Sequence, residues 1–267
     1  MIFRIISQLT KIVFVSFLIF CLVLYFFQEK FLFFPEKLAK NHRFRFDAAF
    51  EELNIKTTDG HQLNAVLFKA DSSKGLIIYL HGNAGSIDSW GEVAKTYTDL
   101  HYDVCLYDYR GYGKSEGKIT SEKQLYLDAQ AVYHQMKKQY KEDSIIVLGY
   151  SIGTGMATYL AANNQPQMLI LQAPYYSMID LAKKKFPIAP SFLLKYKLQN
   201  NLRIKECKMP VLIFHGTEDE VIYYESSKKL QTLFKKEDRL ISLEGETHNG
   251  ITANTEYRAY IKKLLDK

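Results

Sequence analysis

A serine between two glycines is the first feature of this 267-residue chain that could perform chemistry. The segment GYSIG at 149–153 places Ser151 directly after an apolar run and directly before a helix-like stretch. A strand-to-helix turn tight enough to present a nucleophile has little room for side chains two residues to either side, and the two glycines supply that room. Chance would produce this pattern in about one chain in ten of this size, so its weight depends on its position between a strand and a helix.

A serine hydroxyl is a poor nucleophile near neutral pH, so this interpretation requires a histidine base and an acid that orients it. His248 is the candidate base, because it lies in the polar, turn-rich loop GETHNG after the last apolar run. The alternative is an ordinary solvent-exposed loop histidine. The other histidines lie in polar or helical surroundings or precede glycines in tight turns: His42, His61, His81, His101, His134 and His215.

The acid is expected in the loop HGTEDEV at 215–221, which follows the apolar run 211–214. The run at 168–171 continues into Gln-Ala-Pro and offers no carboxylate. Spacing alone does not separate Asp219 from Glu218, and Asp180 is a more distant alternative. Three acids in a row also occur in plain solvated loops.

Two further segments follow apolar runs. HGNAG at 81–85 contains two glycines that let the backbone turn sharply and point amide hydrogens outward, as an anion requires. A plain glycine-rich turn is the alternative. The segment DYRGYGKS at 108–115 predicts a scaffold loop, in which Asp108 and Arg110 are placed to pair and hold neighbouring turns.

The elements that must position these residues alternate along the chain from residue 75 onward. The expected strands are 76–80, 104–107, 145–148, 168–171, 211–214 and 240–243, and the expected helices are 88–100, 121–140, 152–163, 223–234 and 255–265. Strands that are apolar throughout are buried on both faces, so the alternation predicts a doubly wound α/β fold with a mostly parallel sheet. Ligands bind outside the carboxyl ends of the strands in such folds, where the segments above lie. Before this region, 54–68 predicts two strands hinged at Asp59 and Gly60.

Composition excludes some classes of function. The net charge of +6 comes without a long basic run, which argues against a nucleic-acid partner. The three cysteines, Cys21, Cys105 and Cys207, are expected to be free thiols. No motif implies a metal or an organic cofactor, and no internal repeat or low-complexity linker is present.

The N-terminus differs most from a soluble protein, because residues 12–27 form a run of 16 residues without a charge. A span usually needs ~20 residues, and 5–9 can extend the run if Lys11 snorkels. These features predict an uncleaved single-pass membrane anchor. A cleaved signal peptide is the main rival, although the bulky residues 25–27 do not suit a cleavage site. A buried helix is the third alternative.

Basic residues are more numerous after this run than before it, which favours a cytoplasmic main domain, but the side of the membrane stays open. The segment FLFFPEK at 31–37 is expected to be an interfacial aromatic segment that ends near Pro35.

From about Phe31 onward the chain resembles the α/β-hydrolases, and specifically the membrane-anchored α/β-hydrolase-domain serine hydrolases, a group that includes protein depalmitoylases and many bacterial proteins. The resemblance rests on five motifs in family order: HGNAG, DYRGYGKSEG, GYSIG, MPVLIFHGTEDEVI and the THN around His248. It implies Ser151 as the nucleophile, Asp219 as the orienting acid and His248 as the base. It also implies that the backbone amides of Asn83 and Ile152 are the oxyanion donors.

The expected organisation is a membrane anchor at 1–30 and a hydrolase domain at 31–267 with a small cap insertion at about 178–206. The cap carries seven basic residues against Asp180 and Glu206, with aromatic and aliphatic residues between them. A basic, aromatic cap near a membrane suits acyl chains on anionic headgroups, and an ordinary solvated cap face is the alternative.

The predicted function is hydrolysis of carboxylic ester or thioester bonds in acylated small-molecule, lipid or acyl-protein substrates, through a Ser-His-Asp triad and an acyl-enzyme. One alternative is a peptidase of the serine aminopeptidase type, which would need an acidic pocket for the substrate amine. The other is a non-catalytic binding protein that has kept the fold, a class that commonly lacks a triad member.

Overall fold

A computed structural model describes residues 2–266, which fold around one eight-stranded sheet of order β10-β9-β8-β7-β4-β6-β3-β2. The strands of this sheet are β2 (Phe50–Lys56), β3 (Gln62–Phe68), β4 (Gly75–Leu80), β6 (Tyr102–Tyr107), β7 (Ile145–Tyr150), β8 (Met168–Gln172), β9 (Val211–Gly216) and β10 (Arg239–Leu243). From β10 to β6 all neighbours are parallel, whereas β3 pairs antiparallel with β6 and with β2. The mostly parallel α/β-hydrolase architecture expected from the sequence is confirmed, and β2 and β3 form the expected hairpin.

The sheet is buried on both faces because successive side chains of each central strand enter different cores. In β4, Leu76, Ile78 and Leu80 pack into one core, while Ile77 and Tyr79 pack into the other. Every residue of β4 and β7 is buried. This burial explains why these strands are apolar throughout rather than alternating in polarity.

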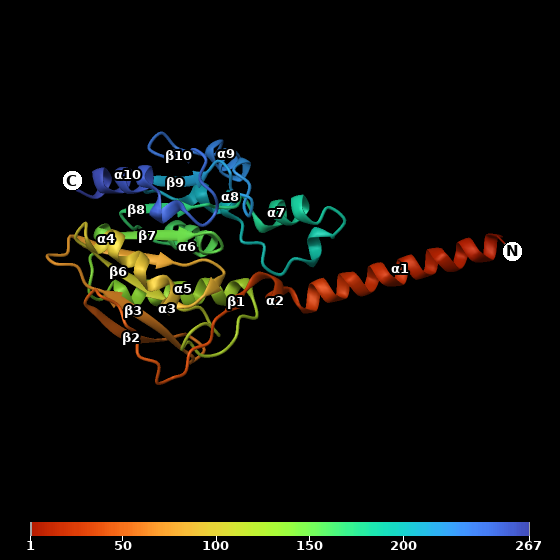
Figure 1. Cartoon of the computed structure of the whole chain (residues 1–267), viewed down its shortest axis with the longest axis horizontal. Coiled ribbons are helices and arrows are strands. Elements are labelled where there is room, and N and C mark those ends of the chain that lie inside the picture. Colours follow the sequence, from red (N-terminus) through yellow and green to blue (C-terminus); the bar gives the residue numbers. More distant parts are fainter. Residues whose placement is uncertain (1, 267) are drawn as a thin grey trace.

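Helices cover both faces (Figure 1). The helices of the hydrolase domain outside the cap are α3 (Ile87–Trp90), α4 (Lys95–Thr98), α5 (Glu122–Met136), α6 (Gly153–Asn163), α9 (Glu225–Gln231) and α10 (Thr255–Leu265). Side chains of α5 and α6 join the first core, and those of α4 and α10 join the second. The helix expected over 88–100 is instead broken into α3, a 3₁₀ turn and α4. The break falls at Gly91, where a Cβ atom would lie 2.3 Å from the ring of Phe46.

The N-terminal helix α1 (Ile2–Phe26) projects away from the rest of the molecule (Figure 1). It is long and apolar enough to cross a membrane, with a mean hydropathy of 2.4 over 18 residues. None of its residues is buried, so it is not a core helix of the hydrolase domain. One residue, Phe27, separates it from the short helix α2 (Gln28–Leu32).

The segment expected to be a cap follows β8. It contains α7 (Met178–Lys185), α8 (Asn200–Arg203) and two 3₁₀ turns, and it lies on the side of the sheet toward α1 (Figure 1). Its tip exposes large apolar side chains, with Ile188 76% exposed and Phe192 80% exposed. Asp180 of α7 forms an ion pair with Lys229 of α9 at 2.7 Å, which fixes the cap to the body of the domain.

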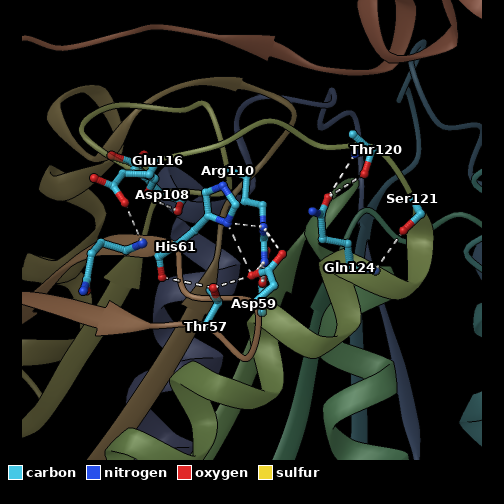
Figure 2. A network of polar contacts seen from close by, with 12 residues as sticks. Thr57, Asp59, His61, Asp108, Arg110, Glu116, Thr120, Ser121 and Gln124 are labelled. Carbon is cyan, nitrogen blue, oxygen red and sulfur yellow. Dashed lines mark hydrogen bonds and ion pairs between the residues drawn. The ribbon is translucent and has the colours of Figure 1, made fainter.

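The loop after β6 is held by Arg110, whose partners differ from those expected (Figure 2). Its guanidinium donates in bidentate fashion to Asp128 of α5, at 2.6 and 2.7 Å, and to Asp59 of the β2–β3 turn, at 2.7 Å twice. The predicted pair of Arg110 with Asp108 is therefore wrong. Asp108 points instead toward the turn after β4, where it accepts a hydrogen bond from the Ile87 amide at 2.9 Å.

Replacement of Arg110 by methionine is expected to lower the free energy of unfolding by about 3–5 kcal/mol, because it leaves the buried Asp128 carboxylate without its partner. Urea denaturation of the two proteins measures the change. Lys40→Met is the matched control, since Lys40 is 71% exposed in its pair with Glu116 and should contribute less than about 1 kcal/mol. Equal losses in the two variants would show that the Arg110 network carries no special weight.

Candidate active site

Ser151 lies at the turn between β7 and α6 with its backbone in the left-handed region, at φ 52°. The turn requires glycine on both sides. A Cβ atom on Gly149 would lie 2.7 Å from the Cβ of Ala157, and one on Gly153 would lie 2.1 Å from the carbonyl oxygen of Leu80. The clearance proposed for the two glycines from the sequence is thus present in the structure.

His248 lies beside Ser151, although the two residues are far apart in the chain. Its Nε2 is 3.0 Å from Ser151 Oγ, and its Nδ1 is 2.7 Å from Asp219 Oδ2. An ionised carboxylate only accepts hydrogen bonds, so Nδ1 carries the proton and Nε2 is left to accept from the serine hydroxyl. The three residues expected to act together are therefore in contact, and all three are buried. The hydroxyl of Tyr150 donates to the His248 carbonyl and helps hold the histidine loop against β7.

The electrostatics of Asp219 keep it ionised. Burial by itself would raise the pKa of this carboxyl, but hydrogen bonds from His215 and His248 outweigh that cost and hold the pKa well below its usual range. The other carboxylate oxygen accepts from the amides of Val221, at 2.8 Å, and Ile222, at 2.7 Å. A carboxylate held in this way is fixed in both charge and orientation.

The structure separates the alternative acids. Glu218 is exposed, and Asp180 is bound to Lys229 and Tyr223, so neither contacts His248. His215, which was expected to be only a turn residue, contacts Asp219 Oδ2 through its Nε2 at 3.2 Å. Its position at the carboxyl end of β9, four residues before Asp219, is the signal that could have identified it.

The expected oxyanion donors lie on two different turns. Ile152 is the N-cap residue of α6 and directly follows Ser151, and Asn83 lies in the turn after β4. Within residues 2–266, no protein group accepts a hydrogen bond from the backbone amide of either residue. The Tyr112 hydroxyl stabilises the Asn83 turn by donating a hydrogen bond to the Asn83 carbonyl at 2.6 Å. Both amides are thus available to a ligand oxygen.

The segment 31–37, which is expected to be interfacial, also supports the Asn83 turn. Phe34 and Pro35 form the two-residue strand β1, which pairs in parallel with β5 (Ala84–Gly85). The Phe34 amide donates to the Asn83 carbonyl at 2.9 Å, and the Glu36 amide donates to the Gly85 carbonyl at 3.0 Å. The segment that follows α1 is therefore part of the support of the candidate active site.

The helix α2 also binds the cap through hydrogen bonds and an ion pair. The Gln28 side chain donates to the Leu193 carbonyl at 3.1 Å and accepts from the Lys195 amide at 2.8 Å. Glu29 pairs with the Lys195 ammonium at 3.0 Å and accepts from the Tyr196 hydroxyl at 2.9 Å. Nothing in the residue pattern of 28–30 pointed to these contacts, because their partners lie more than 160 residues away.

Two titratable groups are buried beneath the Asn83 turn. Burial raises the pKa of Asp108 to about 8 and lowers the pKa of His81 to about 4. His81 Nε2 lies 3.8 Å from Asp108 Oδ1. Among residues 2–266 there is no cluster of three or more histidine, cysteine, aspartate or glutamate side chains that could hold a metal ion.

The buried Asp108 predicts a fall in stability with rising pH. The native carboxyl keeps its proton up to about pH 8, whereas the unfolded chain loses it near pH 3.8, so the free energy of unfolding decreases as pH rises between these values. The lowered pKa of His81 changes the pH dependence of stability only below its ordinary pKa of 6.5. Measurements between pH 6.5 and 8 therefore report on Asp108 without a contribution from His81. Asp108→Asn keeps an acceptor for Ile87 and should flatten the pH dependence in this window, as urea denaturation at several pH values can measure. Asp99→Asn, which removes an exposed carboxylate, should leave it unchanged.

The fold and this serine turn together define an α/β hydrolase. Comparison with solved structures agrees. An esterase from Pyrococcus furiosus superposes with a TM-score of 0.69 at 20% identity, covering 88% of this chain and 96% of that one. Acetyl xylan esterase 1 from Thermoanaerobacterium superposes with a TM-score of 0.67 at 17% identity, covering 85% and 86%.

Sequence comparison specifies the family. Residues 71–205, just over half of the chain, match the model of the serine aminopeptidase family S33. Human alpha/beta hydrolase domain-containing protein 17B is 29% identical over 82% of this chain and 76% of its own length. The Xenopus laevis protein of the same name is 30% identical over 81% and 75%. The chain therefore belongs to the α/β-hydrolase family that includes these domain-containing proteins, as the motifs from HGNAG to THN predicted.

Proposed function

We propose that this protein is a membrane-tethered serine hydrolase that cleaves carboxylic ester or thioester bonds of acylated substrates. The observation that carries the proposal is the continuous contact from Ser151 through His248 to Asp219, at 3.0 and 2.7 Å, beside two available backbone amides. The names of the solved esterases with the same fold support the choice of an ester. No relative's name fixes the acyl group or the leaving group.

The proposed reaction has two halves. Ser151 Oγ attacks the carbonyl carbon while His248 Nε2 takes the hydroxyl proton, and the oxyanion receives hydrogen bonds from the amides of Asn83 and Ile152. His248 then gives its proton to the leaving alcohol or thiol, and an acyl-serine remains. Water, deprotonated by the same imidazole, attacks this ester and releases the carboxylic acid. Asp219 stays ionised throughout and stabilises the imidazolium.

The proposed organisation assigns residues 1–30 to the membrane anchor and 31–267 to the hydrolase domain, with the cap at about 178–206. The support is the length and hydropathy of α1 and its lack of buried residues. Gln28 and Glu29 contact the cap, so the end of the proposed anchor segment also packs against the hydrolase domain.

A peptidase of the aminopeptidase type is the second candidate, because the matching family model carries that description. Such an enzyme needs a free carboxylate to bind the substrate's amine. In the cap, Asp180 is already paired with Lys229. Comparing p-nitrophenyl esters of graded chain length with aminoacyl p-nitroanilides separates the two, and faster turnover of the anilides would reject the esterase.

A fluorophosphonate probe should label the full-length protein, and Ser151→Ala should abolish the labelling because it removes the nucleophile. Gel fluorescence after probe treatment gives the readout. Ser73→Ala, in the loop before β4, is the control and should label like the parent protein. Labelling that survives in Ser151→Ala would contradict the assignment, and absence of labelling in the parent protein would favour a non-catalytic binding role.

Asp219→Asn is expected to lower kcat by about 10⁴-fold, because the amide can no longer hold His248 in the tautomer that accepts the serine proton. Hydrolysis of a p-nitrophenyl ester measures kcat, and a thermal melt checks that the fold is retained. Glu218→Gln is the matched control on the same loop and should lose little. A comparable loss in Glu218→Gln would move the acid to that residue.

A further inference from the structure

A cavity of about 180 Å³ lies between the end of the membrane anchor and the cap. Four of its lining residues come from 24–32 and eleven from 178–194, so neither segment forms it alone. Eleven of the fifteen are apolar, among them Leu24 and Phe31 on the anchor side and Leu181 on the cap side. We refer to it as the anchor–cap cavity.

Each wall of the anchor–cap cavity is connected to a different part of the active site. On the cap side, Met178 follows shortly after Tyr175, whose hydroxyl donates to the carbonyl of Ile152 at 3.1 Å. The C-terminal end of α7 contacts the loop that carries Asp219, since the Lys185 ammonium donates to the Glu220 carbonyl at 3.2 Å.

On the anchor side, Leu32 lines the cavity. Two residues further along the chain, the Phe34 amide donates to the carbonyl of Asn83, which lies in the turn after β4. The two segments that form this partly open cavity therefore also contact the Ser151 turn, the loop that carries Asp219 and the turn that carries Asn83, while none of the triad residues is among the lining residues.

The size and polarity of the anchor–cap cavity fit part of one hydrocarbon chain. An apolar cavity of about 150 Å³ stays dry and accommodates a benzene molecule, so a slightly larger one suits a segment of a single acyl chain and not two chains side by side. The anchor wall is the end of α1, the helix that could cross a bilayer, so the cavity borders the region where lipid chains lie. Lys183 and Lys185 are exposed and contribute positive charge to its lining.

We propose that the anchor–cap cavity binds the acyl chain of a single-chain anionic lipid and presents its ester carbonyl to Ser151. This inference rests on the proposed function. Ser151 Oγ forms the acyl bond, the lipid's headgroup alcohol leaves with the proton from His248, and water releases the free fatty acid. The site is incomplete without the membrane anchor, because one of its walls belongs to that segment.

The acyl site can be tested by filling the cavity from either wall of the full-length protein in detergent micelles. The readout is the ratio of kcat/KM for p-nitrophenyl dodecanoate to that for p-nitrophenyl butyrate. Each methylene bound in an apolar site is worth up to about fourfold in affinity, so the parent protein should favour the longer ester. Leu24→Trp and Leu181→Trp should each lower the ratio by at least about tenfold by occupying space for several methylenes, with butyrate hydrolysis retained.

The controls are Val23→Trp and Lys184→Trp, neighbours of these positions that do not line the cavity. Leu24 lies in α1 outside the hydrolase core, so that variant keeps the test valid even if Leu181→Trp fails to fold. An unchanged ratio in Leu24→Trp, with butyrate still hydrolysed, would overturn the acyl site. A parent protein that neither hydrolyses butyrate nor takes up the fluorophosphonate probe would overturn the proposed function itself, and the lipid site with it.

The headgroup is tested with palmitoyl lysophosphatidylglycerol and palmitoyl lysophosphatidylcholine in mixed micelles, with released palmitate as the readout. The anionic lipid should be cleaved faster, and Lys183→Gln should reduce that preference while Lys184→Gln, on the same helix, should leave it. Equal cleavage of the two lipids would overturn the anionic headgroup. Faster deacylation of an S-palmitoyl cysteine peptide than of either lipid would overturn the lipid as the source of the chain.

Discussion

Ser151 holds its backbone at φ 52°, a conformation that costs a non-glycine residue on the order of 1–3 kcal/mol and persists only where the surroundings impose it. Here the Ser151 amide donates to the Gln172 carbonyl of the neighbouring strand, at 2.9 Å. The missing side chain at Gly153 lets α6 start against the carbonyl of Leu80. The direction of the serine hydroxyl, the availability of the Ile152 amide and the packing of α6 all follow from this one turn.

The second organising feature is the segment that leaves α1. Within ten residues it binds the cap through Gln28 and Glu29 and then adds β1 to the turn that carries Asn83. The cap and the turn that carries Asn83 are far apart in the sequence, and this segment contacts both of them. Its polar contacts are partly buried, so they are not a loose tether of the kind found between independent domains.

The fold was predictable because the strands are buried on both faces and therefore read as continuous apolar runs, which glycine-rich turns interrupt at their ends. Ser151 and His248 were predictable for the same reason, since each follows such a run. The partners of Arg110 were not, because they depend on pairings between distant segments that leave no periodic signal. The contact of His215 with Asp219 was missed although the two residues are only four apart. Asp108 and Arg110 are two residues apart, yet the structure points them toward α3 and α5 respectively. Sequence proximity was a poor guide to contact there.

The single residue between α1 and α2 has a consequence for kinetics. With α1 in a bilayer, Phe27 leaves almost no free linker, so the active site is held at one height and one orientation above the membrane. The membrane-tethered hydrolase proposed above would meet its substrates by lateral diffusion, and its rate would depend on their mole fraction in the membrane rather than on their bulk concentration. Dilution of the substrate with inert lipid would then slow turnover at constant total substrate, which is the behaviour of a surface reaction.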